Sequence, residues 1–359
     1  MIKKIIFLCV GTLAFAYLLF IPILKPFPKP TGTYEIGTTF MQFPHETTPL
    51  TVRFFYPAQL PTNGKKYMYL QNTVNKLAPK LAEQYRVPTW LIKLLLKNIK
   101  THAYSDAPVA KDQTMFPVIL FSHGLLGAFA EMYTYLYEEL ASQGYIIAAI
   151  DHPTLSFLSQ NLKKPFAEFS AHEQKEFQTE ATKKYTADHQ FVMDQLEIVN
   201  TNPKSLFFGK LNLNSIIVAG HSGGGTAALE TCRLDERCKV VINLDGWFDH
   251  VINWEPLNKP ALLLFAGKEP TEIPKPTTAY LKRKELTPEQ YFEHERTINN
   301  HKKALCQSAC CHLTYLPGVK HNSFTDSLLF KWPLREWHAE NAYQLIDQIK
   351  REIVSFLAK

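Results

Sequence analysis

The chain alternates between short, uninterrupted apolar runs and longer polar segments that favour helix. Five runs have the length and composition of buried strands in a parallel sheet, namely residues 116–121, 145–150, 216–219, 239–244 and 260–267. Residues 130–143, between the first two runs, favour a helix. A strand, a helix and a strand at this spacing form a βαβ unit with a right-handed crossover. The pattern therefore predicts an α/β fold with a mostly parallel central sheet.

The remaining segments are predicted to surround this sheet. Residues 31–57 contain alternating apolar and polar positions, for example Thr51–Tyr56, which indicate antiparallel edge strands. Two polar stretches indicate solvated helical insertions, and a last strand and a long helix close the fold; these are residues 154–204, 270–311, 312–316 and 340–358. No internal repeat interrupts the pattern, which predicts one folded domain.

Residues 65–105 are predicted to be helical. Within them, Trp90–Lys100 places Lys93, Lys97 and Lys100 on one narrow stripe, and leucine and isoleucine side chains cover the rest. A helix of this kind lies either at a membrane interface or in a lid or core with one solvated edge. The pattern leaves both interpretations open.

The first 30 residues differ from the rest. Lys3 and Lys4 precede an almost uncharged run, Ile5–Leu24, and a proline-rich stretch follows. About 20 apolar residues can span a bilayer, which favours an N-terminal membrane anchor with the lysines inside. Residues 14–16, Ala-Phe-Ala, also resemble the cleavage site of a removable signal peptide. Both interpretations predict an exported protein, membrane-anchored or secreted, whose folded domain is residues 31–359.

Composition narrows the classes of partner. The 359 residues include 39 basic and 33 acidic side chains, and the net charge of +6 is spread along the chain. This distribution predicts no nucleic-acid partner, whereas an anionic membrane surface fits it. Five cysteines lie in the predicted domain, and export predicts one or two disulfides with at least one thiol left over; they are Cys232, Cys238, Cys306, Cys310 and Cys311. Their spacing fixes no pairing, and it does not match a zinc site.

The apolar run at 216–219 leads into the sequence Gly-His-Ser-Gly-Gly, residues 220–224, which matches the pattern G-x-S-x-G. In that pattern a serine occupies a strained turn between a strand and a helix, and its hydroxyl stands clear of the sheet. Ser222 is therefore the candidate nucleophile. The alternative is an ordinary glycine-rich turn.

A serine nucleophile needs a neighbouring base, and the base needs a carboxylate that holds its tautomer. In an open parallel sheet these groups meet beyond the carboxyl ends of the strands, and six residues are predicted there: His123, Asp151, Ser222, Asp245, Glu269 and His321. His321 follows the last strand and is the best placed base; the other histidines after Ser222 are His250, His294, His301, His312 and His338. Asp245 and Glu269 each follow a strand, and the residues alone leave the acid open between them.

Several motifs together resemble the platelet-activating factor acetylhydrolase family of α/β-hydrolases. They are FPVILFSHGLLGAF and LASQGYIIAAIDHP within residues 116–153, VAGHSGGG, INLDGW and GVKHNSF, with TVRFFYP upstream. The resemblance covers most of the predicted domain. It implies an α/β-hydrolase fold with Ser222 as nucleophile, Asp245 as acid and His321 as base. It further implies an oxyanion hole made by the N–H groups of Leu125 and Gly223.

Two positions depart from the family pattern. Gly223 stands where the family usually has phenylalanine, and SHGLLGAF carries one residue more than the usual SHGLGAF. The second departure leaves open whether Leu125 or Leu126 donates to the oxyanion.

The resemblance implies a calcium-independent serine esterase that cleaves short or oxidised sn-2 acyl groups from phospholipids such as platelet-activating factor. Such an enzyme works at a membrane surface, and neither a metal nor another cofactor is implied. One alternative is an exported α/β-hydrolase that acts on other esters. The other is a membrane-anchored binding protein that retains the fold with an inactive site.

Overall fold

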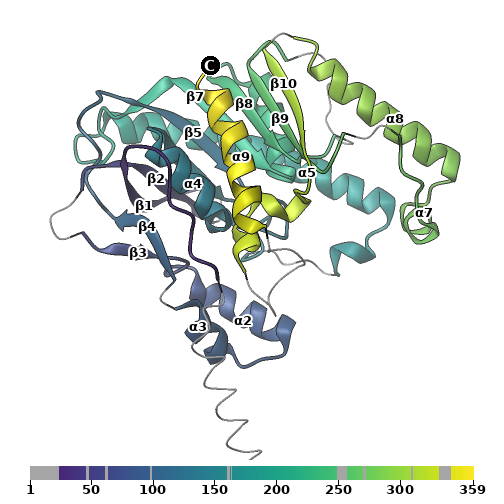
Figure 1. Ribbon diagram of the computed structural model, residues 1–359, viewed down its shortest axis with the longest axis horizontal. Helices are drawn as coiled ribbons and strands as arrows, with labels where there is room; N and C mark the ends of the chain where they lie inside the picture. The colour runs from purple at the N-terminus through teal and green to yellow at the C-terminus, as the bar shows by residue number, and fades with distance from the viewer. Residues whose placement is uncertain are drawn as a thin grey trace, which may run out of the picture.

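The computed structural model of the protein describes residues 24–45, 48–60, 64–97, 99–159, 162, 164–248, 257–269, 272–308, 310–330 and 341–359. Within these residues one sheet of ten strands has the order β10-β9-β8-β7-β5-β6-β2-β1-β4-β3 (Figure 1). The strands are β1 (Glu35–Phe43), β2 (Leu50–Ala58), β3 (Lys66–Met68), β4 (Lys100–Ser105), β5 (Phe116–Ser122), β6 (Ile146–Asp151), β7 (Leu211–His221), β8 (Cys238–Leu244), β9 (Ala261–Ala266) and β10 (Cys311–Leu316).

The centre of the sheet is parallel and one side of it is mixed. Strands β6, β5, β7, β8, β9 and β10 pair in parallel. Strand β2 pairs antiparallel with β6 and with β1, and the hairpin of β3 and β4 joins the edge of β1. This arrangement confirms the predicted α/β fold with a mostly parallel sheet and antiparallel strands at one edge.

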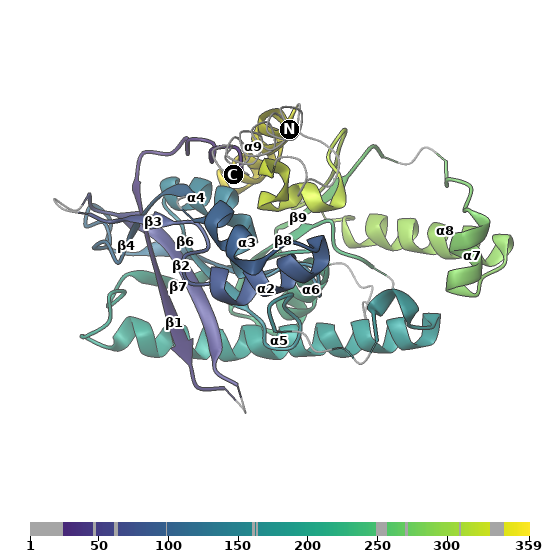
Figure 2. The same ribbon diagram turned by 90° about the horizontal axis from the view of Figure 1, so that it is seen from below.

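Helices cover both faces of the sheet, and Figure 2 shows α9 and α5 on opposite sides of it. The helices are α2 (Val74–Tyr85), α3 (Thr89–Leu96), α4 (Thr134–Ser142), α5 (Ala171–Thr201), α6 (Gly223–Leu234), α7 (Thr278–Lys284), α8 (Pro288–Leu305) and α9 (Ala342–Leu357), with short 3-10 helices η1 (Ala130–Tyr133), η2 (Phe166–Glu168), η3 (His321–Phe324) and η4 (Asp326–Leu329).

Strand residues alternate between the two faces, as the period of two requires. Ile119 and Phe121 of β5 belong to the core that contains residues of α4 and α9. Val118 and Leu120 belong to the core that contains residues of α5 and α6. The continuous apolar runs in the sequence exist because both faces of these strands are covered.

Two predictions about helices are wrong. The helix predicted over Trp90–Lys100 ends at Leu96, because Lys97 has extended backbone angles and Lys100 begins β4. The helical region predicted from residue 65 also contains strand β3. The lysine stripe is therefore shorter than the pattern suggested, and it comprises Lys93 and Lys97.

The predicted insertion at 154–204 is not simply solvated. Its helix α5 has 31 residues and buries one side along the sheet, including Tyr185, Val192 and Leu196. The polar residues Asp188 and His189 are buried on the same helix. The second predicted insertion forms α7 and α8, which Figure 1 shows projecting from the sheet beside β10.

The folded part of the chain begins before the predicted boundary at residue 30. Leu24 and Phe27 are buried, and the Lys25 N–H donates to the carbonyl of Leu329. The rest of the predicted leader, residues 1–23, lies outside the described residues. No helix in the described part of the chain is long and apolar enough to cross a membrane.

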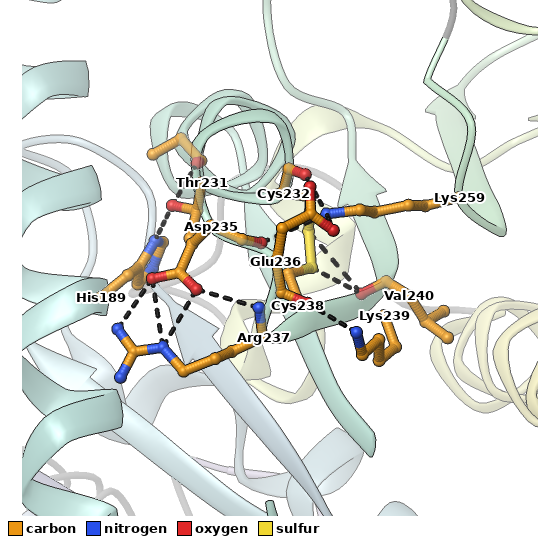
Figure 3. Close-up of a disulfide and its surroundings, with 11 residues drawn as sticks. His189, Thr231, Cys232, Asp235, Glu236, Arg237, Cys238, Lys239, Val240 and Lys259 are labelled. Carbon is orange, nitrogen blue, oxygen red and sulfur yellow. Dashed lines mark hydrogen bonds and ion pairs between the residues drawn. A yellow bond between two sulfur atoms is a disulfide. The ribbon is translucent and has the colours of Figure 1, made fainter. Parts of the chain in front are cut away.

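Two disulfides join neighbouring elements, which fits the predicted one or two. Cys232 and Cys238 link the end of α6 to the start of β8, and Cys306 and Cys311 link the end of α8 to β10. Figure 3 shows the first disulfide beside Arg237 and Asp235, which form an ion pair of 2.7 Å. Cys310 is the thiol left over among the described residues.

Candidate active site

Ser222 occupies a sharp turn between β7 and α6. Its φ of 55° and ψ of −122° are rare for a residue with a side chain. The turn needs glycine on both sides: a Cβ on Gly220 would lie 2.4 Å from the carbonyl carbon of Gly224, and one on Gly224 would lie 2.3 Å from the Ser122 carbonyl oxygen. The predicted strand, strained serine turn and helix are therefore present.

The structure brings Ser222, His321 and Asp245 together, and we call them the outer set. The Ser222 Oγ lies 3.0 Å from Nε2 of His321. The Nδ1 of the same ring lies 2.6 Å from Oδ2 of Asp245. Three separate elements supply these residues: the β7–α6 turn, helix η3 after β10, and the residue that follows β8.

Asp245 is held firmly in this position. It has a φ of 53°, and its Oδ1 accepts a hydrogen bond of 3.0 Å from the N–H of Ala266. Burial alone would raise the pKa of Asp245, but the hydrogen bond and charge of His321, together with the Ala266 amide, lower it below its usual value. An ionised Asp245 accepts a hydrogen bond from the Nδ1–H of His321, which leaves Nε2 unprotonated and able to accept the Ser222 proton.

The other sequence candidates lie elsewhere. Glu269 is exposed beyond β9, and the ring nitrogens of His321 are taken by Asp245 and Ser222. His312 lies in β10 with its ring against Phe356. His294 and His301 lie in α8, as predicted, and His250 and His338 lie outside the described residues.

Two backbone N–H groups at or beside the nucleophile turn have no acceptor among the described residues. The Leu126 N–H donates to the Leu155 carbonyl at 2.8 Å, so that donor is occupied. The N–H groups of Leu125 and Gly223 make no hydrogen bond to any other described residue. These two residues are adjacent, since a Cβ on Gly223 would lie 3.1 Å from the Cβ of Leu125.

Trp247 explains why the residue after Ser222 is glycine. A Cβ on Gly223 would lie 2.6 Å from Cη2 of the Trp247 ring, which leaves no room for a side chain there. The indole therefore occupies the space beside the nucleophile turn that a phenylalanine at position 223 would need.

A second group of polar side chains lies buried behind the site, and sequence reasoning missed it. Ser122 Oγ lies 2.7 Å from Nε2 of His152, and Nδ1 of His152 lies 2.7 Å from Oδ2 of Asp188. We call these three residues the inner set. His189 also bonds to Ser122, at 2.5 Å. Figure 3 shows its other ring nitrogen beside Thr231, at 2.6 Å from the hydroxyl oxygen. In the sequence, the inner set and its neighbour consist of a serine at the end of a strand and two histidines among polar residues. The periodicity of apolar residues does not detect such a group.

Of the remaining edge candidates, His123 joins this buried group. The Nε2 of His123 accepts the His152 backbone N–H at 3.2 Å and lies 3.7 Å from Asp151. Burial lowers the pKa of His123 to about 3 and raises that of Asp151. Both residues therefore support the loop after β5 and do not contact the outer set.

The outer set opens into a cavity of about 1010 Å³. Its walls come from α2, the loop after β5 and the segment before α5, and its apolar lining includes Leu77, Leu81, Phe129, Phe157 and Phe166. Two cations also line it. Lys164 is paired with Glu173 at 2.9 Å. Lys80 lies 5.6 Å from the ring centroid of Phe157 and forms no ion pair with a described residue.

The parallel sheet, the strained serine turn and the outer set define an α/β-hydrolase. The fold is also that of a solved ferulic acid esterase from Streptomyces cinnamoneus, with a TM-score of 0.65 and 21% sequence identity over 92% of each chain. That likeness concerns the fold alone.

Sequence comparison points to one family. The family model for platelet-activating factor acetylhydrolase, isoform II, matches residues 24–201. The platelet-activating factor acetylhydrolase of Cavia porcellus is 28% identical over 246 residues, 61% of this chain and 55% of that protein. The one of Canis lupus familiaris is 25% identical over 287 residues, 69% of this chain and 61% of that protein. These matches support the platelet-activating factor acetylhydrolase family as the one to which this chain is related.

The matches cover only part of the relatives and only part of this chain. The matched parts span 55% and 61% of the length of the two relatives. The family match at 24–201 includes the loop with Leu125 and ends before Ser222. The placement of the outer set therefore comes from the geometry of this chain.

Proposed function

We propose that this protein is a serine esterase that hydrolyses the sn-2 ester of phospholipids with short or oxidised acyl chains. The observation that carries the proposal is the hydrogen-bonded outer set at the wall of a large, mostly apolar cavity. Similarity to the platelet-activating factor acetylhydrolase family supports this substrate class. Ser222 is the nucleophile, His321 the base and Asp245 the acid that orients it.

The reaction follows from the positions of these groups. Ser222 Oγ attacks the ester carbonyl carbon while His321 Nε2 takes its proton. The carbonyl oxygen becomes an oxyanion, and the N–H groups of Leu125 and Gly223 donate to it. When the carbon–oxygen bond to the glycerol breaks, His321 returns the proton to the leaving alcohol, and an acyl-enzyme remains on Ser222. Water, activated by His321, then releases the acid and restores the serine.

In each step of this reaction, a residue of the chain takes or returns the proton or stabilises the charge. The proposed mechanism therefore assigns no step to calcium or to another cofactor. The two backbone donors stabilise the charge that develops in the transition state. Removal of one such donor typically costs about 100- to 1000-fold in rate. Leu126 is not proposed as a donor, because its N–H already bonds to Leu155.

Lys80 supports a substrate that carries a phosphate. It is a cation on the cavity wall without an ion-pair partner among the described residues, and a phosphodiester would supply its counter-charge. We propose that Lys80 contacts the phosphate when the sn-2 ester lies at Ser222.

We also propose that α2 and α3 contact the membrane surface. Tyr85, Trp90 and Leu94 are 36%, 56% and 45% exposed, and Tyr85 lines the cavity. Lys93 and Lys97 are exposed beside them. Figure 1 shows both helices together at one end of the molecule. Exposed aromatic and leucine side chains beside lysines suit an anionic lipid surface.

Export remains part of the proposal. The apolar leader predicted in residues 1–30 would deliver the domain to the outside of the membrane, as an anchored or a cleaved form. Mass spectrometry of the chain purified from the membranes and from the medium of its native cells decides between them, because a cleaved form starts after Ala16.

The proposal is tested by comparing two substrates. The protein should hydrolyse 2-acetyl phosphatidylcholine in vesicles and release acetate, with or without a calcium chelator, and it should also hydrolyse p-nitrophenyl butyrate. Lys80→Met should lower kcat/KM about tenfold on the phospholipid alone, because only that substrate carries a phosphate. Lys76→Met is the matched control, since Lys76 is exposed on α2 and does not line the cavity.

Two outcomes would contradict the proposal in different ways. Hydrolysis of p-nitrophenyl butyrate without any phospholipid hydrolysis would leave an esterase for other substrates. If Lys80→Met lowers kcat/KM equally on both substrates, Lys80 does not bind the phosphate.

A further inference from the structure

A chain of three hydrogen bonds runs behind Ser222 and links the two loops on either side of it. The Gly124 N–H donates to the Tyr133 hydroxyl oxygen at 2.9 Å. The Tyr133 hydroxyl lies 3.0 Å from Nδ1 of His221. The Nε2 of His221 lies 2.9 Å from the backbone carbonyl oxygen of His321. Tyr133 and His221 are both buried.

The direction of every bond in this chain is fixed by chemistry. The His321 carbonyl can only accept, so Nε2 of His221 carries a proton and donates it. Burial lowers the pKa of His221 to about 3, so the ring is neutral and its Nδ1 is bare. Nδ1 therefore accepts the Tyr133 O–H. The Tyr133 oxygen has lone pairs left, and it accepts the Gly124 N–H.

Packing reinforces this chain. The His221 ring lies against the His321 ring, with centroids 4.6 Å apart and planes 41° apart. On its other side, a Cβ on Gly124 would lie 3.2 Å from Nδ1 of His221, so the loop backbone is in close contact with the ring. His221 directly precedes Ser222, and Gly124 directly precedes Leu125.

We propose that Tyr133 and His221 are positioning residues that hold the oxyanion donor and the base in register with the nucleophile. This inference rests on the proposed serine esterase function. The bond to the His321 carbonyl fixes the backbone of the base, so that its Nε2 points at the Ser222 hydroxyl. The bond from Gly124 fixes the loop that presents the Leu125 N–H. Neither Tyr133 nor His221 exchanges a proton with the substrate.

The test compares three variants on p-nitrophenyl butyrate. His221→Leu removes both bonds of the ring and should lower kcat about 100-fold, since a displacement of about 1 Å in a catalytic group can cost that much. KM should change by less than about twofold, because Tyr133 does not line the cavity and His221, which borders it, has a buried side chain. Tyr133→Phe removes one oxygen atom and should lower kcat about tenfold or more.

Rescue by a conservative variant separates positioning from simple packing. His221→Gln retains an N–H that can reach the His321 carbonyl and should recover at least about tenfold of the kcat lost in His221→Leu. A His221→Leu enzyme with wild-type kcat, a loss that appears in KM, or a loss that glutamine does not restore would each overturn the inference. Where His221→Leu does not fold, Tyr133→Phe decides by the same criteria.

A second measurement does not depend on turnover. The ¹⁵N chemical shifts of His221 in the wild-type protein should show a bare Nδ1 and a protonated Nε2, and Tyr133→Phe should change the Nδ1 signal. The opposite tautomer in the wild type would overturn the inference. A wild-type protein with this tautomer but without activity on any ester would instead count against the proposed function.

Discussion

The outer and inner sets contain the same three residue types in nearly the same geometry, but they lie in different surroundings. The distance from serine to histidine is 3.0 Å in the outer set and 2.7 Å in the inner set. The distance from histidine to carboxylate is 2.6 Å and 2.7 Å. Both serines lie at the carboxyl end of a parallel strand. Hydrogen-bond geometry alone therefore does not identify a catalytic arrangement.

Access and the neighbouring donors distinguish the two sets. The outer histidine is half exposed and lines the cavity, whereas all three side chains of the inner set are buried. The inner hydroxyl is shared between two histidines, so its lone pairs and proton are already engaged. The outer serine is next to the unoccupied N–H of Gly223 and has the strained backbone that presents its hydroxyl. We infer that the inner set is structural.

The largest effect is expected from removing Ser222, and removal of Ser122 gives the comparison. Ser222→Ala should lower kcat on p-nitrophenyl butyrate about 10⁶-fold and abolish labelling by a fluorophosphonate, because it removes the nucleophile. Ser122→Ala should keep kcat within about tenfold and lower the free energy of unfolding by about 1–3 kcal/mol, because two buried histidines lose a partner. Labelled peptides identified by mass spectrometry check the assignment. A label on Ser122, or an active Ser222→Ala protein, would reverse the roles of the two sets.

The acid of the outer set gives the next largest effect. Asp245→Asn should lower kcat about 10⁴-fold, because an amide favours the wrong tautomer of His321. Glu269→Gln serves as the control and should leave kcat unchanged, since Glu269 is exposed and His321 bonds to Asp245. Steady-state rates of the two purified variants suffice. Loss of turnover in Glu269→Gln with an active Asp245→Asn would show that the acid was assigned wrongly.

The acid of the inner set should affect stability and its pH dependence. Burial alone would raise the pKa of Asp188, but the hydrogen bond and charge of His152, with Lys184 and His45, lower it below its usual value. A carboxylate with a lowered pKa stabilises the fold above its unfolded pKa of about 4, and this contribution is lost as the pH falls through the folded pKa. Asp188→Asn should therefore cost about 1–3 kcal/mol at neutral pH and progressively less below about pH 4.

Urea unfolding at neutral pH and at about pH 3 measures this difference. Asp194→Asn is a suitable control, because Asp194 lies on the same helix, is 63% exposed and pairs with Arg237 at the surface. Its effect should be small at both pH values. A deficit in Asp188→Asn that does not change with pH would mean that the carboxylate charge is not what stabilises the inner set.

The sequence predicts the strands and the turn that carry the site better than the buried side chains that pack around them. The continuous apolar runs identify β5, β7, β8 and β9 because both faces of these strands are buried. The turn at Ser222 was predictable because its backbone leaves no room for a Cβ at positions 220 and 224, where the pattern has glycine. Asp245 and Glu269 each follow a strand, so the pattern alone could not decide which of them is the acid. The family resemblance favoured Asp245, and the structure places Asp245 beside His321.

Other features could not be read from patterns of apolar residues. Helix α5 buries Asp188 and His189, and periodicity treats such residues as a solvated face. The end of α3 at Leu96 depends on the pairing of β4 with β1, which is remote in sequence. The contact of Tyr133 with His221 joins residues 88 positions apart. These features arise from tertiary contacts, and a local pattern carries no information about them.

The burial of Leu24 and Phe27 has a consequence for how the protein would meet the proposed lipid substrate. If the predicted leader is retained in the bilayer, its apolar run ends at Leu24, which pairs with Phe330, and the next residue, Lys25, bonds to the Leu329 carbonyl. No linker would then separate the leader from the folded domain. The orientation of the folded domain relative to the membrane would then be restricted. Only lipids next to the leader could reach the active site and be hydrolysed. A recombinant protein that starts at Thr31 would lack the buried side chains of Leu24 and Phe27. It should melt at a lower temperature than one that starts at Leu24.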